Sequence, residues 1–515
     1  MLSRCYIEAS LVFIAYKAYL VITIIYTASF GLLSQHRPAF IDRTELLRWF
    51  LLWLSLITLL VITPTLSLFY LAFLFIIVMF GPKSAEKRVL YYLFLLIAIP
   101  QFSLMITSVA GISLMLPITY SRLAIIALLL PLFTRTTIYP TSRLNTDYFL
   151  LFFVFIVMIL SFRQTTFSNA LRENSLLLLD IIVPYYIISR HIDTVDKINR
   201  AFYVLFIAIM PLSVIGLFEP YKHWLLYNDI YHALAEGRYI LYDMRAGSIR
   251  AAASTSGGPV LGFIITIVLG LLFYLQRFIT QKRYLYLAFS TLLLCLFMTK
   301  TRGAWLGFVV LLGTYFITSP NKRQQLGLFL VSAILLSPLL LYTAVGQKLI
   351  QLLPFFGDIR IDTIDYRSRL LEQSWLVIQT YPFFGNPHFI QSPALEVMRQ
   401  GEGIIDIVNS YLQITLEYGF VTLSLFIAIL LSITWRCYRL IKPLTRINAD
   451  QLAHLSRVFF AIMLSIIVMI FTISMVNFIP VIFWVIIALA TAFIRISQRE
   501  IAQSATTTSP RQDND

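Results

Sequence analysis

Long apolar runs recur along the whole chain and alternate with short polar segments. Each run holds about 17 to 25 residues, enough for a helix to cross a hydrocarbon layer about 30 Å thick. Lipid offers the backbone no hydrogen-bond partner, so runs of this kind predict α-helices. The pattern therefore predicts an all-α, polytopic transmembrane helical bundle of about 14 spans. The predicted spans are 11–33, 47–81, 89–106, 118–134, 148–163, 174–189, 200–219, 258–276, 283–299, 303–319, 326–346, 411–434, 457–477 and 480–495.

Two of these runs need a further decision. Pro64 interrupts the run 47–81, and proline removes a helical hydrogen bond, so we expect either one kinked helix or two short ones. The first run lacks a small-residue cleavage site after it, so we interpret it as a retained span.

Composition and charge agree with a membrane protein. Apolar residues make up 59% of the chain and charged residues 13%, and the mean hydropathy is +0.82, whereas soluble domains carry about 25% charged residues. The net charge of +15 does not indicate nucleic-acid binding, because the basic residues cluster in short connections, which predicts that these connections are cytoplasmic. The clusters are Lys83, Lys87 and Arg88; Arg277, Lys282 and Arg283; Lys322 and Arg323; and Arg436, Arg439, Lys442, Arg446 and Arg457.

Two long connections fall on the opposite face. Residues 220–257 hold four basic and three acidic residues, and residues 347–407 hold five basic and seven acidic ones. Neither has the basic excess of a cytoplasmic loop, so we predict that both are periplasmic. The predicted organisation is one polytopic domain over 1–495, followed by a disordered cytoplasmic tail over 496–515. Long loops often carry function, so we expect the active face to look outward.

Motifs for metals and nucleotides are lacking in the sequence. The six histidines are scattered, and neither a Walker A loop nor a CxxC pair occurs. We therefore expect no metal and no cofactor, and no disulfide in the long loops.

The most polar stretch lies between residues 365 and 419. Arg369 lies on a predicted amphipathic helix that ends before Pro382, with Asp365 one turn before it. Arg369 can face a polar cavity, or it can form only a solvated pair with Asp365. The apolar stripe expected to pack on the bundle is Leu371, Trp375 and Ile378.

Two further arginines stand at span ends on the same predicted face. Arg302 lies in TKTRGAWLGFVV, and Arg250 lies before the small-residue stretch 254–258. Either can be an interfacial anchor. Guanidinium also suits bidentate phosphate recognition, and stretch 254–258 can form an anion nest. We therefore predict that Arg250, Arg302 and Arg369 converge on one phosphate-bearing substrate, where they neutralise charge in place of a metal.

The remaining candidates surround the start of the span at 411. Asn409 can hydrogen-bond a substrate as a catalytic-site residue, or it can simply cap the helix. Glu417 lies inside the span, where a carboxylate needs a partner or water. The residues predicted to bind substrate are Arg367, Asp365, Glu417, Tyr411 and His388. The general base stays open among Asp365, Glu372, Glu402, Asp406 and His388.

Taken in order, these motifs resemble a known family. Arg250 with its small-residue run, TRGAWLG, RSRLLEQSW followed by YPFFG, and NSYLQITLEYGF together are similar to the O-antigen ligase and O-antigen polymerase superfamily, over roughly residues 190–435. The resemblance implies a metal-independent glycosyltransferase of the outer leaflet. Its partners would be an undecaprenyl-pyrophosphate-linked glycan, an acceptor saccharide and the bilayer.

One departure bears on the subtype. Ligases of this family carry a histidine directly before the asparagine of the Asn-x-x-Leu helix start, and this chain has Val408 there. This favours a polymerase-type member over a ligase that attaches glycan to lipid A-core. A lipid-linked oligosaccharide flippase and a peptidoglycan polymerase are the alternatives. The sugar repeat, the acceptor, the oligomeric state and any chain-length regulator stay open.

Overall fold

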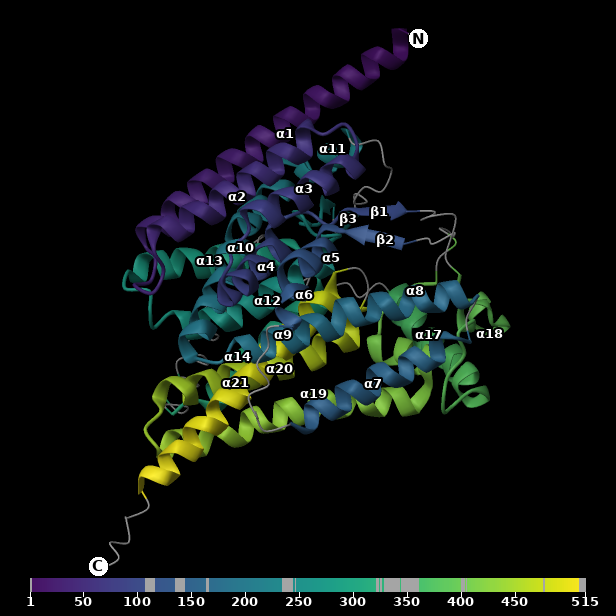
Figure 1. The fold of residues 1–515 in the computed structure, drawn as a ribbon. Coiled ribbons are helices and arrows are strands. Elements are labelled where there is room, and N and C mark those ends of the chain that lie inside the picture. The colour runs from purple at the N-terminus through teal and green to yellow at the C-terminus, as the bar shows by residue number, and fades with distance from the viewer. Residues whose placement is uncertain are drawn as a thin grey trace, which may run out of the picture. The chain divides into compact units, whose positions relative to one another are not determined.

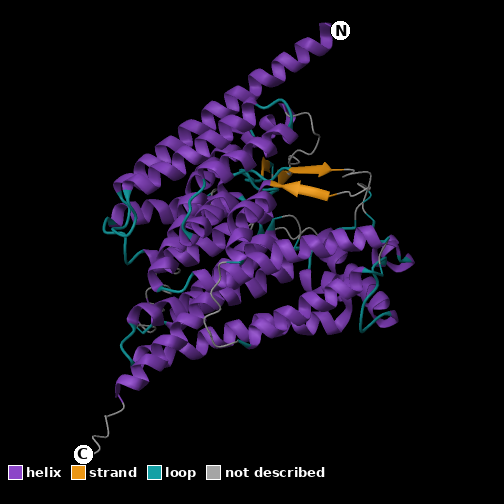
Figure 2. Ribbon diagram, in the orientation of Figure 1, coloured by secondary structure: helices purple, strands orange, loops and turns teal. Residues whose placement is uncertain are grey.

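The computed structural model describes residues 2–106, 116–134, 144–163, 166–233, 244–245, 247–320, 361–399, 403, 405–475 and 478–508, together with 324, 327 and 343. Helices dominate these segments (Figures 1 and 2). Seven of the described helices are long and apolar enough to cross a membrane, and four shorter ones are also apolar. The chain is therefore an all-α polytopic membrane protein, as predicted. The expected number of about 14 spans stays a prediction, and the span predicted at 326–346 lies outside the described residues.

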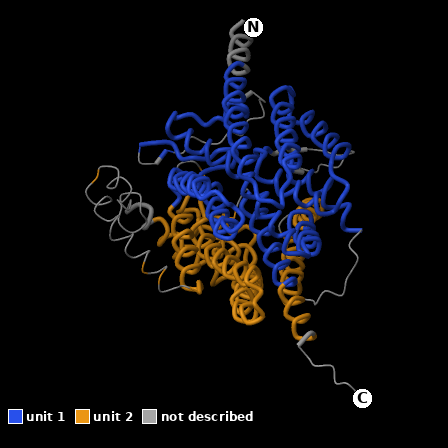
Figure 3. Tube along the Cα trace, turned by 90° about the vertical axis from the view of Figure 1, so that its left-hand side faces the viewer, with its two compact units in different colours: residues 1–139, 178–301, 477–496 blue, residues 140–177, 302–476, 497–515 orange. Residues whose placement is uncertain are grey.

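Contacts divide the chain into two compact units (Figure 3). Unit 1 comprises residues 1–139, 178–301 and 477–496, and unit 2 comprises residues 140–177, 302–476 and 497–515.

Unit 1 is built around one long, almost fully buried helix, α10 (Val195–Lys222), which packs against α1, α4, α12 and α13. The other helices of the unit are α1 (Leu2–Gln35), α2 (Arg43–Ile62), α3 (Leu66–Phe80), α4 (Ala85–Ala98), α5 (Tyr120–Ala124), η1 (Ile125–Leu129), α6 (Leu130–Phe133), η2 (Leu178–Ile182), α9 (Val183–His191), α11 (Leu226–Ala233), α12 (Gly258–Leu275) and α13 (Lys282–Met298). Among the described residues of the unit, strands form two antiparallel hairpins, which are β1 (Ser103–Ile106) with β2 (Leu116–Thr119) and β3 (Met244–Arg245) with β4 (Ser248–Ile249).

Unit 2 is built on a stack of three helices. Helix α20 (Asp450–Thr472) packs against both α14 (Arg302–Thr318) and α19 (Ser410–Arg446), and α19 also packs against α7 (Asn145–Ser161). The remaining described helices of the unit are α8 (Phe167–Leu177), α17 (Ile361–Thr380), η3 (Phe389–Gln391) and α18 (Pro393–Glu396). Helix α21 (Ile479–Thr508) begins in unit 1 and ends in unit 2.

Three helix boundaries differ from the sequence prediction or decide between its alternatives. The run around Pro64 forms two helices, because α2 ends at Ile62 and Thr65 caps α3 by accepting from the Leu68 N–H. The span predicted over 89–106 ends at Ala98, two residues before Pro100, and the chain then turns into β1. The tail predicted as disordered is helical as far as Thr508, since residues 496–508 contain neither glycine nor proline.

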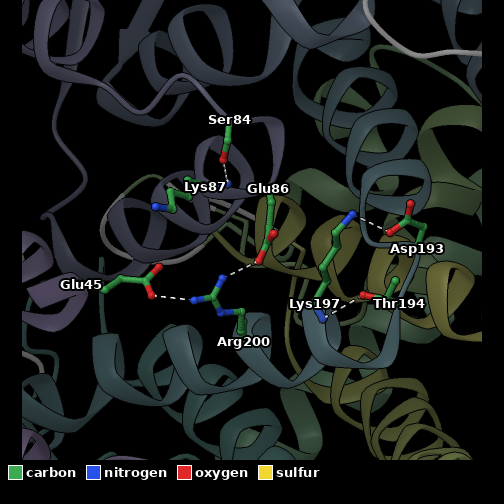
Figure 4. A network of polar contacts seen from close by, with 8 residues as sticks. All are labelled: Glu45, Ser84, Glu86, Lys87, Asp193, Thr194, Lys197 and Arg200. Carbon is green, nitrogen blue, oxygen red and sulfur yellow. Dashed lines mark hydrogen bonds and ion pairs between the residues drawn. The ribbon is translucent and has the colours of Figure 1, made fainter. Parts of the chain in front are cut away.

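A polar cluster in unit 1 joins the N-terminal ends of three helices (Figure 4). The Arg200 guanidinium of α10 donates to Glu45 of α2 and to Glu86 of α4, each over 2.8 Å. Both carboxylates lie in the first turn of their helices, where the helix dipole favours negative charge. The same dipole disfavours Arg200 near the start of α10, so the two carboxylates are what stabilise it there. Arg200 thus ties α2, α4 and α10 together.

We expect Arg200→Ala to destabilise unit 1, because it leaves two partly buried carboxylates without their cation. The cost should be about 1–3 kcal/mol, less than for a fully buried pair. The matched control is Lys197→Ala on the same helix. Lys197 pairs with the exposed Asp193 over 2.6 Å, and its loss should cost less than about 1 kcal/mol. Thermal unfolding in detergent measures both. Equal midpoints for the two variants would contradict a structural role for Arg200.

The predicted topology can be tested at exposed positions. Val397 lies on the loop before α19 and is 80% exposed. Thr445 lies at the C-terminal end of α19 and is also exposed. Cys295 and Cys437 are buried, so labelling reports the introduced residue once Cys5 is replaced by serine. An impermeant maleimide should label Val397→Cys in intact cells and Thr445→Cys only after lysis. The reverse pattern would overturn the predicted orientation.

Candidate active site

Two glycines determine where Arg302 lies. Arg302 begins α14, and Gly303 and Gly307 place the next two turns directly against α20. A Cβ atom at Gly303 would lie 2.2 Å from Thr472 Oγ1, and one at Gly307 would lie 2.3 Å from Met469 Cγ. Small residues four apart allow two membrane helices to approach closely. The TRGAWLG motif therefore fixes the guanidinium-bearing end of α14 in unit 2.

Helix α17 rests on a small apolar core of its own. The buried face of α17 carries Leu370, Val377 and Ile378. The stripe predicted from sequence was wrong in two of its three members, because Leu371 is 56% and Trp375 is 49% exposed. The helix is turned by about one residue from the predicted orientation. The residues that cover its buried face come from outside α17 and are Phe389, Leu395, Met398, Ile405, Ile407, Leu412 and Leu416.

Polar residues of α17 and of the segment before α19 lie beside this core. The Tyr366 hydroxyl of α17 donates to the Asp406 carbonyl over 3.2 Å and accepts from the Asp406 N–H over 3.1 Å. Partial burial raises the pKa of the Asp406 carboxyl, and the nearby Arg367 lowers it. Partial burial also lowers the pKa of Arg367, which Asp406 raises and Arg302 lowers further. Arg302, Arg367 and Asp406 therefore interact, although they come from three segments of unit 2.

Arg369 lies on the same helix but away from the buried stripe. Successive helical residues are rotated by about 100°, so Arg367 falls about 60° from Leu370 on the side of Ile378, whereas Arg369 falls about 100° from Leu370 on the other side. Both arginines are exposed. Asp365 falls within α17, and its side chain lies outside the described residues, so its pairing with Arg369 stays a prediction. Arg367 interacts with Arg302, and Arg369 has interactions of its own.

The start of α19 is held by capping and by contacts with the end of α20. Asn409 Oδ1 accepts from the N–H groups of Tyr411 and Leu412 over 2.9 and 3.2 Å, so Asn409 is the helix cap. The Tyr411 hydroxyl donates to the Ile467 carbonyl over 3.0 Å. Ser410 likewise donates to the Ile473 carbonyl over 2.8 Å. The structure thus shows the capping role that was one of the two alternatives for Asn409. It gives Tyr411 a structural contact that the sequence analysis did not include.

Helix α19 breaks at Gly419, and the YPFFG turn fills the break. Gly419 has φ 77° and ψ 179°, a conformation essentially restricted to glycine. The N–H groups of Phe420 and Val421 donate to the carbonyls of Pro382 and Phe383 over 2.8 and 3.2 Å. In return, the Asn386 N–H donates to the carbonyl of Leu416 over 2.8 Å. The two motifs YPFFG and EYGF are therefore two halves of one hydrogen-bonded joint.

Arg163 completes this joint, and the sequence analysis did not identify it as a site residue. Its guanidinium donates to the carbonyls of Phe384 and Gly385 over 2.8 and 3.2 Å. The signal available in the sequence was its position at the end of a predicted span. The Glu417 side chain interacts with Tyr418 at the same break, where the helix is interrupted. His388, by contrast, is exposed on the loop.

The third predicted arginine belongs to unit 1. Arg250 Nε donates to the Thr299 carbonyl over 2.9 Å, and Arg250 Nη2 donates to Thr301 Oγ1 over 2.8 Å. A Cβ atom at Gly258 would lie 2.7 Å from the Thr299 carbonyl oxygen and 3.0 Å from Arg250 Nε. Glycine is thus required at 258 for this arginine to lie across the start of α12. The convergence of Arg250 with Arg302 and Arg369 stays a prediction.

An internal carboxylate occupies the backbone amides next to Arg250. Glu219 Oε2 accepts from the N–H groups of Ala252 and Ala253, each over 2.9 Å. Ala253 has a positive φ of 48°, which turns two successive N–H groups toward one acceptor. The protein's own Glu219 therefore occupies the two amides that precede stretch 254–258, and the nest predicted over 254–258 stays a prediction.

A family model described as O-antigen ligase matches residues 287–427. The match includes Arg302, the exposed side of α17, Asp406 and the joint at Gly419. It confirms the predicted resemblance to the O-antigen ligase and O-antigen polymerase superfamily. No curated protein matches the chain. The family match supports a ligase- or polymerase-type role in surface polysaccharide synthesis, and a glycosyltransferase-like enzyme in a multi-pass bacterial membrane protein.

The joint at Gly419 predicts a specific sensitivity. A Cβ atom at Gly419 would lie 2.2 Å from the Phe383 carbonyl oxygen. Gly419→Ala should therefore lower the yield of folded protein, with about 1–3 kcal/mol of backbone strain in addition to the clash. Gly313→Ala is the control, because a Cβ atom there meets nothing within 4 Å. Monodisperse yield on size-exclusion chromatography should fall only for Gly419→Ala, and a normal yield would contradict the joint.

Proposed function

We propose that the protein is a polymerase-type membrane glycosyltransferase. It transfers a glycan from an undecaprenyl-pyrophosphate donor to an acceptor saccharide, in the synthesis of O-antigen, capsule or exopolysaccharide. The site faces the periplasm from the bacterial inner membrane, as the distribution of basic residues suggests.

The observation that carries the proposal is the interaction of Arg302 with Arg367 inside the matched segment. Two guanidinium groups that interact place positive charge and hydrogen-bond donors near one point. Asp406 contributes a carboxylate that interacts with Arg367. A pyrophosphate presents oxygens that two guanidinium groups suit.

The reaction requires stabilisation of a leaving group. The acceptor hydroxyl oxygen forms a bond to the anomeric carbon of the donor glycan, and the bond from that carbon to the pyrophosphate oxygen breaks. The electron pair stays on undecaprenyl pyrophosphate, and the hydroxyl proton leaves to a base. Arg302 and Arg367 act by stabilising the charge that develops on the pyrophosphate. Arg250 and Arg369 are further candidates for the same charge.

The polymerase subtype rests on Val408. Valine cannot accept a proton, so the histidine implicated in ligases has no counterpart at that position. The acceptor in this proposal is a growing saccharide rather than lipid A-core.

Arg302→Ala and Arg367→Ala should each abolish long polymer while protein abundance stays near normal. Lysine at either position should restore polymer only in part, because it keeps the charge but loses the two-point fork. The measurement is the surface polysaccharide profile of a deletion strain complemented with each variant, set against protein abundance. Arg399→Ala is the control, because Arg399 pairs with the exposed Glu396 on the same loop.

The deletion strain also separates the alternatives. Single repeats that accumulate on the lipid carrier indicate a polymerase, unattached long chains indicate a ligase, and loss of outward-facing lipid-linked glycan indicates a flippase. Normal polymer from stable Arg302→Ala and Arg367→Ala proteins would contradict the proposed roles of the two arginines. Membranes treated with chelator should keep their activity, and strict dependence on added Mg²⁺ would contradict charge neutralisation by arginine alone.

A further inference from the structure

We propose that Asp406 is the general base that takes the proton from the acceptor hydroxyl, an inference that rests on the transferase function proposed above. The sequence offered five candidates for this role without separating them. The contacts of Asp406 in unit 2 separate it from the others.

The backbone of Asp406 is fixed while its side chain is open to solvent. Ile405 and Ile407, its neighbours, are each 8% exposed and belong to the core under α17. Because alternate residues of an extended segment point to opposite sides, Asp406 points away from that core, and it is exposed. Tyr366 holds both backbone polar groups of Asp406. A substrate can therefore reach a carboxylate that the chain positions rigidly.

The charges around Asp406 suit a base beside a pyrophosphate. Arg367 on α17 interacts electrostatically with Asp406, and Arg302 at the start of α14 interacts with Arg367. Partial burial raises the pKa of Asp406 above its usual value, and Arg367 offsets part of this rise. A higher pKa makes the carboxylate a better proton acceptor near neutral pH. Asp406 thus lies next to the cations that stabilise the leaving group.

The other described candidates lack this combination. Glu372 is exposed on α17, and His388 is exposed on the loop. The side chains of Asp365 and Glu402 lie outside the described residues. Asp406 also lies two residues before Val408, so the chain carries a carboxylate near the position where ligases carry histidine.

The proton balance is simple. The Asp406 carboxylate accepts the proton of the acceptor hydroxyl as the oxygen bonds to the anomeric carbon. The bond to pyrophosphate breaks, and undecaprenyl pyrophosphate leaves with the electron pair. Asp406 then releases the proton to water, so no oxidant, reductant or further reactant is required.

The test uses membranes that contain the full chain and, as donor, the lipid-linked glycan extracted from the deletion strain. Asp406→Asn should lower the turnover rate by about 100-fold or more, with little change in the donor concentration that gives half the maximal rate. Asp406→Glu should keep part of the rate. Glu396→Gln is the matched control, because Glu396 is an exposed carboxylate of the same loop that pairs with Arg399.

The pH profile distinguishes a base from a structural residue. The wild-type rate should rise with pH through the pKa of Asp406, because only the carboxylate accepts a proton. Asp406→Glu should move this limb to higher pH, since glutamate has the higher intrinsic pKa. This shift decides the question even if Asp406→Asn fails to fold.

The outcomes for the two proposals are separable. If wild-type membranes make no polymer from this donor, the transferase function itself is wrong. If wild-type membranes polymerise while the Arg302 and Arg367 variants do not, the function stands. Asp406→Asn with most of the wild-type rate and an unchanged pH limb would then overturn the role of Asp406 alone.

Discussion

Hydrocarbon offers the backbone no hydrogen-bond partner, and the joint in α19 follows from that constraint. A membrane helix can break only where another part of the protein satisfies the freed groups. At Gly419, the turn formed by YPFFG accepts from Phe420 and Val421 and donates to Leu416, and Arg163 binds the turn's own carbonyls. The joint anchors the segment between α17 and α19, and so it positions every candidate residue on that segment.

The same constraint governs charge. In unit 1, Arg200 holds two carboxylates at helix starts, and Glu219 lies against two backbone N–H groups. Each of these groups has partners that account for its place in the fold. In unit 2, Arg367 and Asp406 are exposed and interact with each other, and Arg302 interacts with Arg367. Two cations and an accessible carboxylate within one unit are the basis for proposing a substrate site there.

Two other candidate residues have structural contacts that account for their positions. Asn409 caps α19, and Tyr411 joins α19 to α20. Both remain necessary to the proposed site, because they determine where the segment that carries Asp406 ends. A residue can therefore be indispensable to a transferase of this kind without touching the glycan.

The length of the apolar runs and the positions of helix-breaking residues predicted the helices from the sequence alone. The predicted span 258–276 is α12, Gly258–Leu275, and the break at Pro64 was visible in the chain. These features depend on neighbouring residues only. The same holds for the candidate arginines, because Arg250 and Arg302 were identified at span ends and Arg369 on a polar loop helix. Tertiary structure decided which face of α17 is buried, that Arg367 interacts with Arg302, and that Asp406 interacts with Arg367. Those outcomes depend on contacts between segments far apart in the chain, and helical periodicity carries no information about which distant residues will cover a given face.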